Sequence, residues 1–229
     1  MLMFLHMRPC YVVCGYGIPA DILNDQNYDI YLRTVFNTVF DGCSKTGIWN
    51  PHIVFSGGKS DMRKPYRRTE AQEMMKFFRV LMLRPAVKVK VKAWTLVAEM
   101  KSLSTLDNFI YVRDLLEQRS IESSSLSVFC EKTRVERVKA ITRKVFTKAV
   151  VIPIDFDQST NRYLDPALLQ RISREGAKFD LWALKSEANL KKHRDIFKEK
   201  FVYLRKAGPD VHVEAVRMWW EKKLKELDA

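Results

Sequence analysis

Two hydrophobic periods alternate along the first two thirds of the chain. Short runs of β-branched and aromatic residues, typical of buried strands, are separated by longer segments whose apolar residues recur every three or four positions, as on one face of a helix. The predicted strands cover residues 11–14, 52–56, 91–98, 126–130 and 149–154. The predicted helices between them cover residues 29–41, 69–83, 104–116 and 134–147. This alternation predicts an α/β, Rossmann-like fold of three layers, in which a parallel sheet carries helices on both faces.

The pattern changes after residue 157, where helical periods continue without a further strand pattern. Asp165 followed by Pro166 is typical of a helix start, with the aspartate as N-cap and proline in the first turn. Gly176 is predicted to end that helix. A second helix is predicted over residues 180–206, and Gly208-Pro209 separates it from a last helix. The C-terminal part is therefore predicted to be entirely helical.

The change of pattern divides the chain into two parts. Residues 1–157 are predicted to form the Rossmann-like domain, and residues 158–229 a helical extension packed on it. Trp219 and Trp220 are expected to be buried where the last helix meets the rest of the protein, with a partner-binding face as the alternative. Lys200 is expected to belong to the solvated, basic face of the preceding helix.

The ends of the predicted strands carry the candidate chemistry. The second strand runs into Ser56-Gly57-Gly58, and a helix pattern opens at Thr69. Glycine tolerates positive φ and close approach, and a helix N-terminus presents free N–H groups to an anion. Ligands of such sheets bind beyond the carboxyl ends of the strands, so we predict a site for an anionic ligand there. Its candidate residues are Gly15, Gly17, Ser56, Gly57, Gly58, Lys59, Glu70, Glu99, Ser104, Thr105, Asn108, Glu131, Arg134 and Arg137.

The charged members of this set have distinct candidate roles. The basic side chains would add charge-assisted hydrogen bonds to a phosphate or carboxylate. Glu70 and Glu99 are the catalytic candidates, because a carboxylate at this edge could bind a hydroxyl group, a ribose or a divalent metal, or act as a general base. Structural alternatives stay open: Glu70 also suits the first turn of a helix, and Ser104 with Asp107 resembles a capping box.

The net charge widens the choice of partner. The chain has 40 Lys and Arg against 27 Asp and Glu, which gives a net charge of +13 and favours acidic ligands or polyanions. A basic run between residues 134 and 148 fits either a solvated helix face or an RNA or ribonucleoprotein surface that neutralises phosphates without reading sequence. No RNA-recognition motif accompanies it. Its members are Arg134, Arg137, Lys139, Arg143, Lys144 and Lys148.

Composition excludes several other classes. An apolar fraction of 47% excludes wholesale disorder. The apolar segment 1–7 is too short to span a bilayer and no later run is long enough, so we expect no integral membrane segment. Neither the cysteines nor the histidines have metal-ligand spacing, so we expect no metal site. The cysteines Cys10, Cys14, Cys43 and Cys130 are predicted to be reduced thiols, in the cytoplasm or another reducing compartment.

The order of the strand-end motifs is itself informative. A glycine-containing first loop is followed by Ser56-Gly57-Gly58, then Thr69-Glu70-Ala71, then Glu99 with Ser104-Thr105 and Asn108. Over residues 11–154 this series resembles the YdcF-like family, also called domain-of-unknown-function family 218, which includes the SanA and ElyC envelope proteins. The resemblance implies a Rossmann-like fold and a small-molecule site at these loops. It also implies S-adenosylmethionine or a nucleotide as a possible ligand.

The chain departs from the family pattern after its fourth predicted strand. Cys130-Glu131 replaces threonine and serine, and Arg134 replaces a histidine, whereas Arg137 keeps the family's arginine. Arginine stays protonated, so a proton transfer through that histidine would be lost. The resemblance therefore implies either a small-molecule-binding protein, whose reaction is unassigned if it is an enzyme, or a non-catalytic protein of an RNA–protein assembly on a degenerate enzyme fold.

Overall fold

The computed structural model describes residues 8–121, 123–156 and 166–228. Its centre is one five-stranded sheet of order β3-β2-β1-β4-β5, in which every neighbouring pair is parallel. The strands are β1 (Arg8–Cys14), β2 (His52–Ser56), β3 (Thr95–Glu99), β4 (Ser123–Glu131) and β5 (Val150–Ile154). The predicted α/β, Rossmann-like fold is confirmed.

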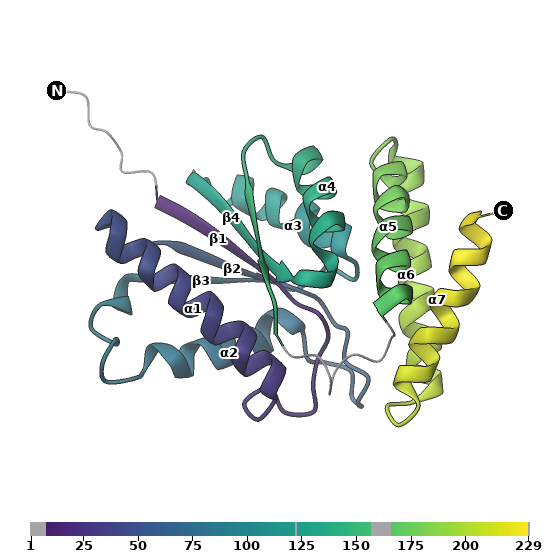
Figure 1. Ribbon diagram of the computed structural model, residues 1–229, viewed down its shortest axis with the longest axis horizontal. Helices are drawn as coiled ribbons and strands as arrows, with labels where there is room; N and C mark the ends of the chain where they lie inside the picture. The colour runs from purple at the N-terminus through teal and green to yellow at the C-terminus, as the bar shows by residue number, and fades with distance from the viewer. Residues whose placement is uncertain (1–7, 122, 157–165, 229) are drawn as a thin grey trace.

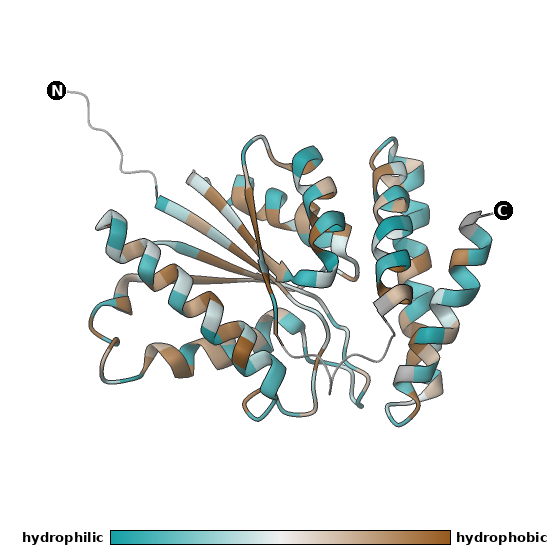
Figure 2. Ribbon diagram, viewed as in Figure 1, coloured by the Kyte–Doolittle hydropathy of each residue, from teal (hydrophilic) through white to brown (hydrophobic). Residues whose placement is uncertain are grey.

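Helices cover both faces of this sheet (Figure 1). Along the strands, side chains point alternately to the two faces. Val13, Phe55 and Phe129 therefore pack with the first two helices, whereas Val12 and Val128 pack with the next two. Figure 2 shows the resulting hydrophobic stripe along the strands. The connecting elements are α1 (Gln26–Thr46), α2 (Glu70–Met82), the 3₁₀ turn η1 (Val91–Ala93), α3 (Thr105–Gln118), the 3₁₀ turn η2 (Lys132–Arg134) and α4 (Val135–Val145).

Three further helices stand beside α4 at the carboxyl edge of the sheet (Figure 1). They enclose a third apolar cluster, in which Trp219 and Trp220 are only 9% and 7% exposed, as expected for buried residues. None of the helices in the described ranges has both the length and the apolar character needed to cross a membrane. The three helices are α5 (Pro166–Ala183), α6 (Glu187–Ala207) and α7 (His212–Asp228).

A buried ion cluster joins these helices to the Rossmann-like part. Arg137 of α4 donates two hydrogen bonds to Asp180 of α5, from Nε at 2.6 Å and from Nη2 at 2.9 Å. His193 Nε2 of α6 lies 2.9 Å from Asp180 Oδ1. Burial alone would raise the pKa of Asp180, but the nearby Arg137 charge and the His193 hydrogen bond lower it overall. The cluster therefore holds an ionised carboxylate where α4, α5 and α6 meet.

Gly176 does not end a helix, contrary to the sequence-based prediction. It lies inside α5, and a Cβ there would stand 2.8 Å from Nη1 of Arg137. Its missing side chain lets α5 approach the buried guanidinium, which is why a residue with poor helix propensity occupies this position.

Other boundaries also differ from the prediction. The segment 180–206 is not one helix, because the chain turns at 184–186 and Ser186 caps α6 by accepting a hydrogen bond from the Asn189 N–H. The third strand begins at Thr95 and not at residue 91, since η1 precedes it. The predicted N-cap Asp165 lies outside the described residues.

Candidate functional site

A cavity of about 470 Å³ lies between the carboxyl edge of the sheet and helices α5 to α7. The strand order reverses direction at β1, with β2 on one side and β4 on the other. Such a switch point opens a crevice beyond the strand ends, where ligands of this fold class bind. The volume lies in the usual range for small-molecule sites. The extension thus converts an open crevice into a walled cavity.

Most of the predicted site residues line this cavity, although they come from four separate strand ends. Lys59, Ser56 and Glu99 do not line it. The residues that do are Gly15, Gly17, Gly57, Gly58, Glu70, Ser104, Thr105, Asn108, Glu131, Arg134 and Arg137.

Glu99 organises the loop that follows β3. The side chain is 3% exposed, and Oε1 accepts hydrogen bonds from the backbone N–H groups of Lys101 at 2.6 Å and Ser102 at 3.0 Å. Its Oε2 accepts the Ser56 hydroxyl at 2.7 Å. Both carboxylate oxygens are thereby engaged, which gives Glu99 and Ser56 a structural role here. Exposed Lys59 contributes its carbonyl oxygen, which accepts a hydrogen bond from Arg205 Nη2 of α6 at 2.6 Å.

Two glycines permit the close approach of the loops. A Cβ on Gly15 would lie 1.9 Å from Glu70 Oε2, and a Cβ on Gly58 would lie 2.0 Å from the carbonyl oxygen of Ser102. Any larger residue would therefore push the glutamate or the loop after β3 out of place. These glycines, which were predicted as site residues from their positions at strand ends, allow the loops to pack closely against each other as well as lining the cavity.

Glu70 is a half-buried carboxyl group at the start of α2. Thr69 caps this helix by accepting a hydrogen bond from the Gln72 N–H, and Glu70 Oε1 accepts the Ser60 hydroxyl at 2.5 Å. Burial raises the pKa of Glu70, and this effect outweighs the lowering by the Ser60 hydrogen bond and the Arg134 charge. The carboxyl group therefore keeps its proton to a higher pH than an exposed glutamate does, which suits a proton donor.

Replacing Glu70 with glutamine is expected to change how stability depends on pH. A carboxyl group with a raised pKa in the folded state binds more protons folded than unfolded, so it lowers stability as pH rises above its ordinary value of 4.5. Glu70→Gln removes this loss. As pH rises, the free energy of unfolding of the variant should therefore increase relative to that of the wild type, by about 1.4 kcal/mol for each unit by which the folded pKa exceeds the unfolded pKa. Urea unfolding from pH 4 to pH 8 measures the gap. A gap that shrinks as pH rises contradicts the assignment.

Positive charge and hydrogen-bond donors also line the cavity. Arg134 reaches back from η2, and its Nη1 and Nη2 donate to the Gly15 carbonyl oxygen, both at 3.1 Å. The N-terminus of α3 also lies at the cavity, with Ser104 as N-cap and Thr105 next to it. The Ser102 hydroxyl is buried in the cavity wall and has no hydrogen-bond partner among the described residues. A buried polar group of this kind calls for a ligand or water oxygen.

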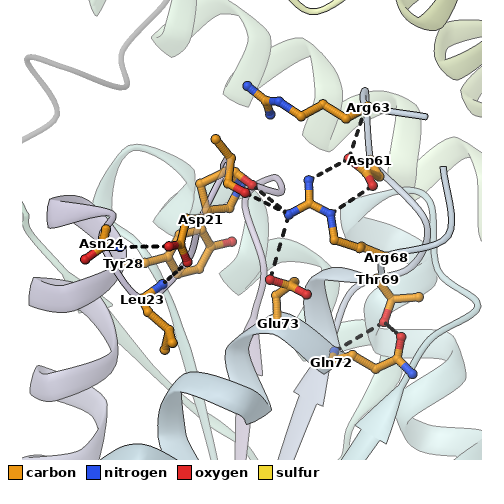
Figure 3. Close-up of polar contacts among 12 residues, drawn as sticks. Asp21, Leu23, Asn24, Tyr28, Asp61, Arg63, Arg68, Thr69, Gln72 and Glu73 are labelled. Atoms are coloured by element: carbon orange, nitrogen blue, oxygen red, sulfur yellow. Dashed lines mark hydrogen bonds and ion pairs between the residues drawn. The ribbon is translucent and has the colours of Figure 1, made fainter. Parts of the chain in front are cut away.

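An arginine clamp holds the loops after β1 and β2 together (Figure 3). Arg68 donates to Asp61 from Nη2 at 2.9 Å and from Nε at 3.0 Å. Its Nη1 also donates to the carbonyl oxygens of Pro19 and Ala20, each at 3.1 Å. The bidentate pair with Asp61 orders the loop after β2. The two Nη1 hydrogen bonds then tie this loop to the loop after β1. These contacts shape the part of the cavity rim that Pro19 and Ala20 line.

The helical extension supplies cavity residues that the sequence-based prediction missed. Lys200, assigned above to a solvated face, lines the cavity together with Phe197, Phe201 and Leu204 of α6. The signal was present in the sequence, since Lys200 lies three residues after Phe197 and four before Leu204, on the apolar stripe of the helix. Other lining residues that the prediction missed include Tyr16, Ser60, Thr133, Phe156 and Trp220.

The described residues show neither an activated thiol at the strand ends nor a cluster of metal ligands. Burial raises the pKa of Cys130 to about 11, and it also raises the pKa of Cys14 well above its usual range. Neither thiol is therefore activated as a nucleophile. All four cysteines are free and buried. No group of three or more His, Cys, Asp or Glu side chains within the described ranges could hold a metal ion.

The basic run of residues 134–148 is divided between the interior and the surface. Arg137 is buried and Arg134 half-buried at the cavity, whereas Arg143, Lys144 and Lys148 are exposed. Only part of the run is thus available as a continuous surface.

Comparison with protein-family models, with curated proteins and with solved structures finds no match for this chain.

Proposed function

We propose that this protein binds an anionic small molecule, a nucleotide or an S-adenosylmethionine-like compound, in the cavity beyond the sheet. The observation that carries the proposal is the meeting of four strand-end loops, the α3 N-terminus and the Arg134 guanidinium at one walled cavity. Phosphate or carboxylate oxygens would accept hydrogen bonds from Arg134, from free N–H groups of α3 and from the Ser102 hydroxyl. If the protein is an enzyme, its reaction is unassigned.

An aromatic stack supports a ligand with a flat ring. Tyr16 stacks on Tyr28 with ring centroids 4.2 Å apart, and its centroid lies 5.1 Å from that of Phe156. All three residues line the cavity. Base–aromatic stacking contributes about 1–3 kcal/mol in nucleic-acid complexes, so such a wall suits an adenine-like ring. The choice of a nucleotide or adenosyl compound otherwise rests on the resemblance to the YdcF-like family.

The proposal is tested with a panel of nucleotides, S-adenosylmethionine and phosphate esters, by thermal shift and then by calorimetry. Arg134→Leu should weaken the best ligand by about 10- to 100-fold, because a charge-assisted hydrogen bond is worth about 1.5–3 kcal/mol. Arg143→Leu is the matched control, since it removes the same charge from an exposed position in the last turn of α4. Absence of any stabilising ligand across the panel, or equal losses in both variants, would contradict the proposal.

RNA binding is the second candidate, favoured by exposed Arg143, Lys144 and Lys148. Such a surface would bind single-stranded RNA with an affinity that falls steeply with salt. Fluorescence anisotropy with a labelled RNA distinguishes the two candidates, because Arg143→Leu should then weaken binding and Arg134→Leu should do so less. An affinity that is independent of salt would reject this candidate.

A further inference from the structure

The amine of Lys200 occupies an unusual position in the cavity wall. Its Nζ lies 5.0 Å from the ring centroid of Trp220 and 5.4 Å from that of Trp219. The rings of Phe197 and Phe201 are 5.7 Å and 5.9 Å away. No hydrogen bond or ion pair engages Nζ within the part of the chain that the structure describes. The amine of this cavity-lining residue thus lies near four aromatic rings and forms no ion pair with a carboxylate of the described residues.

The charges around this amine oppose its protonation. Burial and the guanidinium charges of Arg137 and Arg134 together lower the pKa of Lys200 to about 8, although the charge of an ionised Glu70 acts in the opposite direction. His212 of α7 also interacts with it electrostatically. At pH 7 about one amine in ten is then unprotonated, against fewer than about one in a thousand for an exposed lysine. A desolvated lysine beside other cations is a usual form of activated amine nucleophile.

Three groups with complementary roles therefore face one cavity. Lys200 offers an amine, Glu70 a carboxyl group whose pKa is raised by burial, and Arg134 a positive charge for an anionic substituent. The opposite charges of Glu70 and Lys200 favour the ionised form of each other, but for both groups burial has the larger effect. An amine, an acid and an anion site are the minimum required for condensation with a carbonyl compound that carries a phosphate or carboxylate.

We propose that Lys200 forms a reversible imine with the carbonyl group of an anionic aldehyde or ketone bound in this cavity. The amine nitrogen attacks the carbonyl carbon, and a proton passes from nitrogen to oxygen to give a carbinolamine. Glu70 then gives its proton to the hydroxyl group, which leaves as water while the C=N bond forms. The products are a protonated imine, one water and the Glu70 carboxylate, so charge and atoms balance. The inference rests on the proposed function, because it names a ligand class for the same site.

Reductive trapping tests the imine directly. Full-length protein is incubated with equimolar pyridoxal 5′-phosphate, an anionic aldehyde, reduced with borohydride, digested and mapped by mass spectrometry. Lys200 is expected to carry most of the label, at least tenfold more than exposed lysines such as Lys198. Lys200→Arg keeps the positive charge and should reduce labelling to the background of the surface. Lys198→Arg is the matched control and should leave labelling unchanged.

Two further probes separate the imine from simple binding. Pyridoxine 5′-phosphate has the same ring and phosphate but an alcohol in place of the aldehyde, so it should protect Lys200 without becoming attached. Pyridoxal without phosphate should label Lys200 at least tenfold more slowly, because Arg134 has no anion to bind. Label spread evenly over surface lysines, or labelling that persists at the same level in Lys200→Arg, would overturn the proposal.

The result also distinguishes this inference from the proposed function. If a nucleotide or phosphate ester stabilises the protein but Lys200 is not trapped, the imine is rejected and anion binding stands. If Lys200 is trapped and no panel member binds, the ligand class narrows to carbonyl compounds and the nucleotide proposal fails.

Discussion

Asp180→Ala is expected to lower the free energy of unfolding by about 3–5 kcal/mol, the cost of removing one partner from a buried ion pair. Arg137 is 5% exposed and His193 fully buried, so water would solvate both groups poorly once the carboxylate is lost. An uncompensated guanidinium would remain between α4 and α5. Guanidinium chloride unfolding followed by circular dichroism measures the loss.

Asp195→Ala is the matched control for that experiment. Asp195 lies on α6 and pairs with Lys191 at 2.8 Å and Lys198 at 3.0 Å, but its side chain is 39% exposed. Exposed pairs contribute about 0–1 kcal/mol, so this variant should unfold almost as the wild type does. A loss at Asp180 no larger than at Asp195 would show that the buried cluster does not hold the extension in place.

Gly58→Ala should reduce ligand affinity at least 100-fold and lower stability by about 1–3 kcal/mol. The added Cβ would stand 2.0 Å from the Ser102 carbonyl oxygen, which belongs to backbone and cannot rotate away. The loop after β3 is held by Glu99, and the Gly58 carbonyl oxygen accepts the Glu70 N–H at 3.1 Å. Relief of the collision therefore displaces two walls of the cavity. Calorimetry with the best panel ligand and denaturant unfolding measure both effects.

Gly47→Ala is the control for Gly58→Ala, because it adds backbone strain without a steric collision. Gly47 follows the end of α1 with a φ of 72°, has nothing within 4 Å of its Cβ position and does not line the cavity. The left-handed conformation costs an alanine about 1–2 kcal/mol, so this variant should lose stability and keep its ligand affinity. Unchanged affinity in Gly58→Ala would indicate that these two loops do not shape the binding site.

The cavity exists because the helical extension closes the carboxyl edge of the sheet. Arginine contacts tie the two parts at separate points. Arg194 of α6 donates to Asp107 of α3 at 2.8 Å, and Arg205 donates to the Asp61 carbonyl oxygen at 3.1 Å. The Arg137–Asp180 pair links α4 and α5. The sheet provides the anion-binding loops, and the extension provides the aromatic wall and the Lys200 amine.

The sequence by itself determined the α/β fold and most of the sheet-side wall of the cavity. Both follow from local patterns. The hydrophobic period of a strand or helix can be recognised within a segment of roughly 5 to 15 residues. Glycine and polar residues that follow the strands must lie at one edge of the sheet, because all strands of a parallel sheet end there. The positions of Gly15, Gly58 and Glu70 at the cavity could therefore be predicted without any knowledge of the sheet order.

Only the tertiary structure decided which polar groups remain open to a ligand. Glu99 and Arg137 looked alike as ligand-binding candidates, but the first is engaged by the loop after β3 and the second by Asp180, 43 residues further along the chain. Gly176 looked like a helix end, although it is a contact point for Arg137. Lys200 looked like a solvated lysine until α7 placed two tryptophans beside it. Each of these outcomes depends on which distant segment packs against a residue. The local hydrophobic period of the sequence does not identify that segment, because it reflects only the residue's own helix or strand.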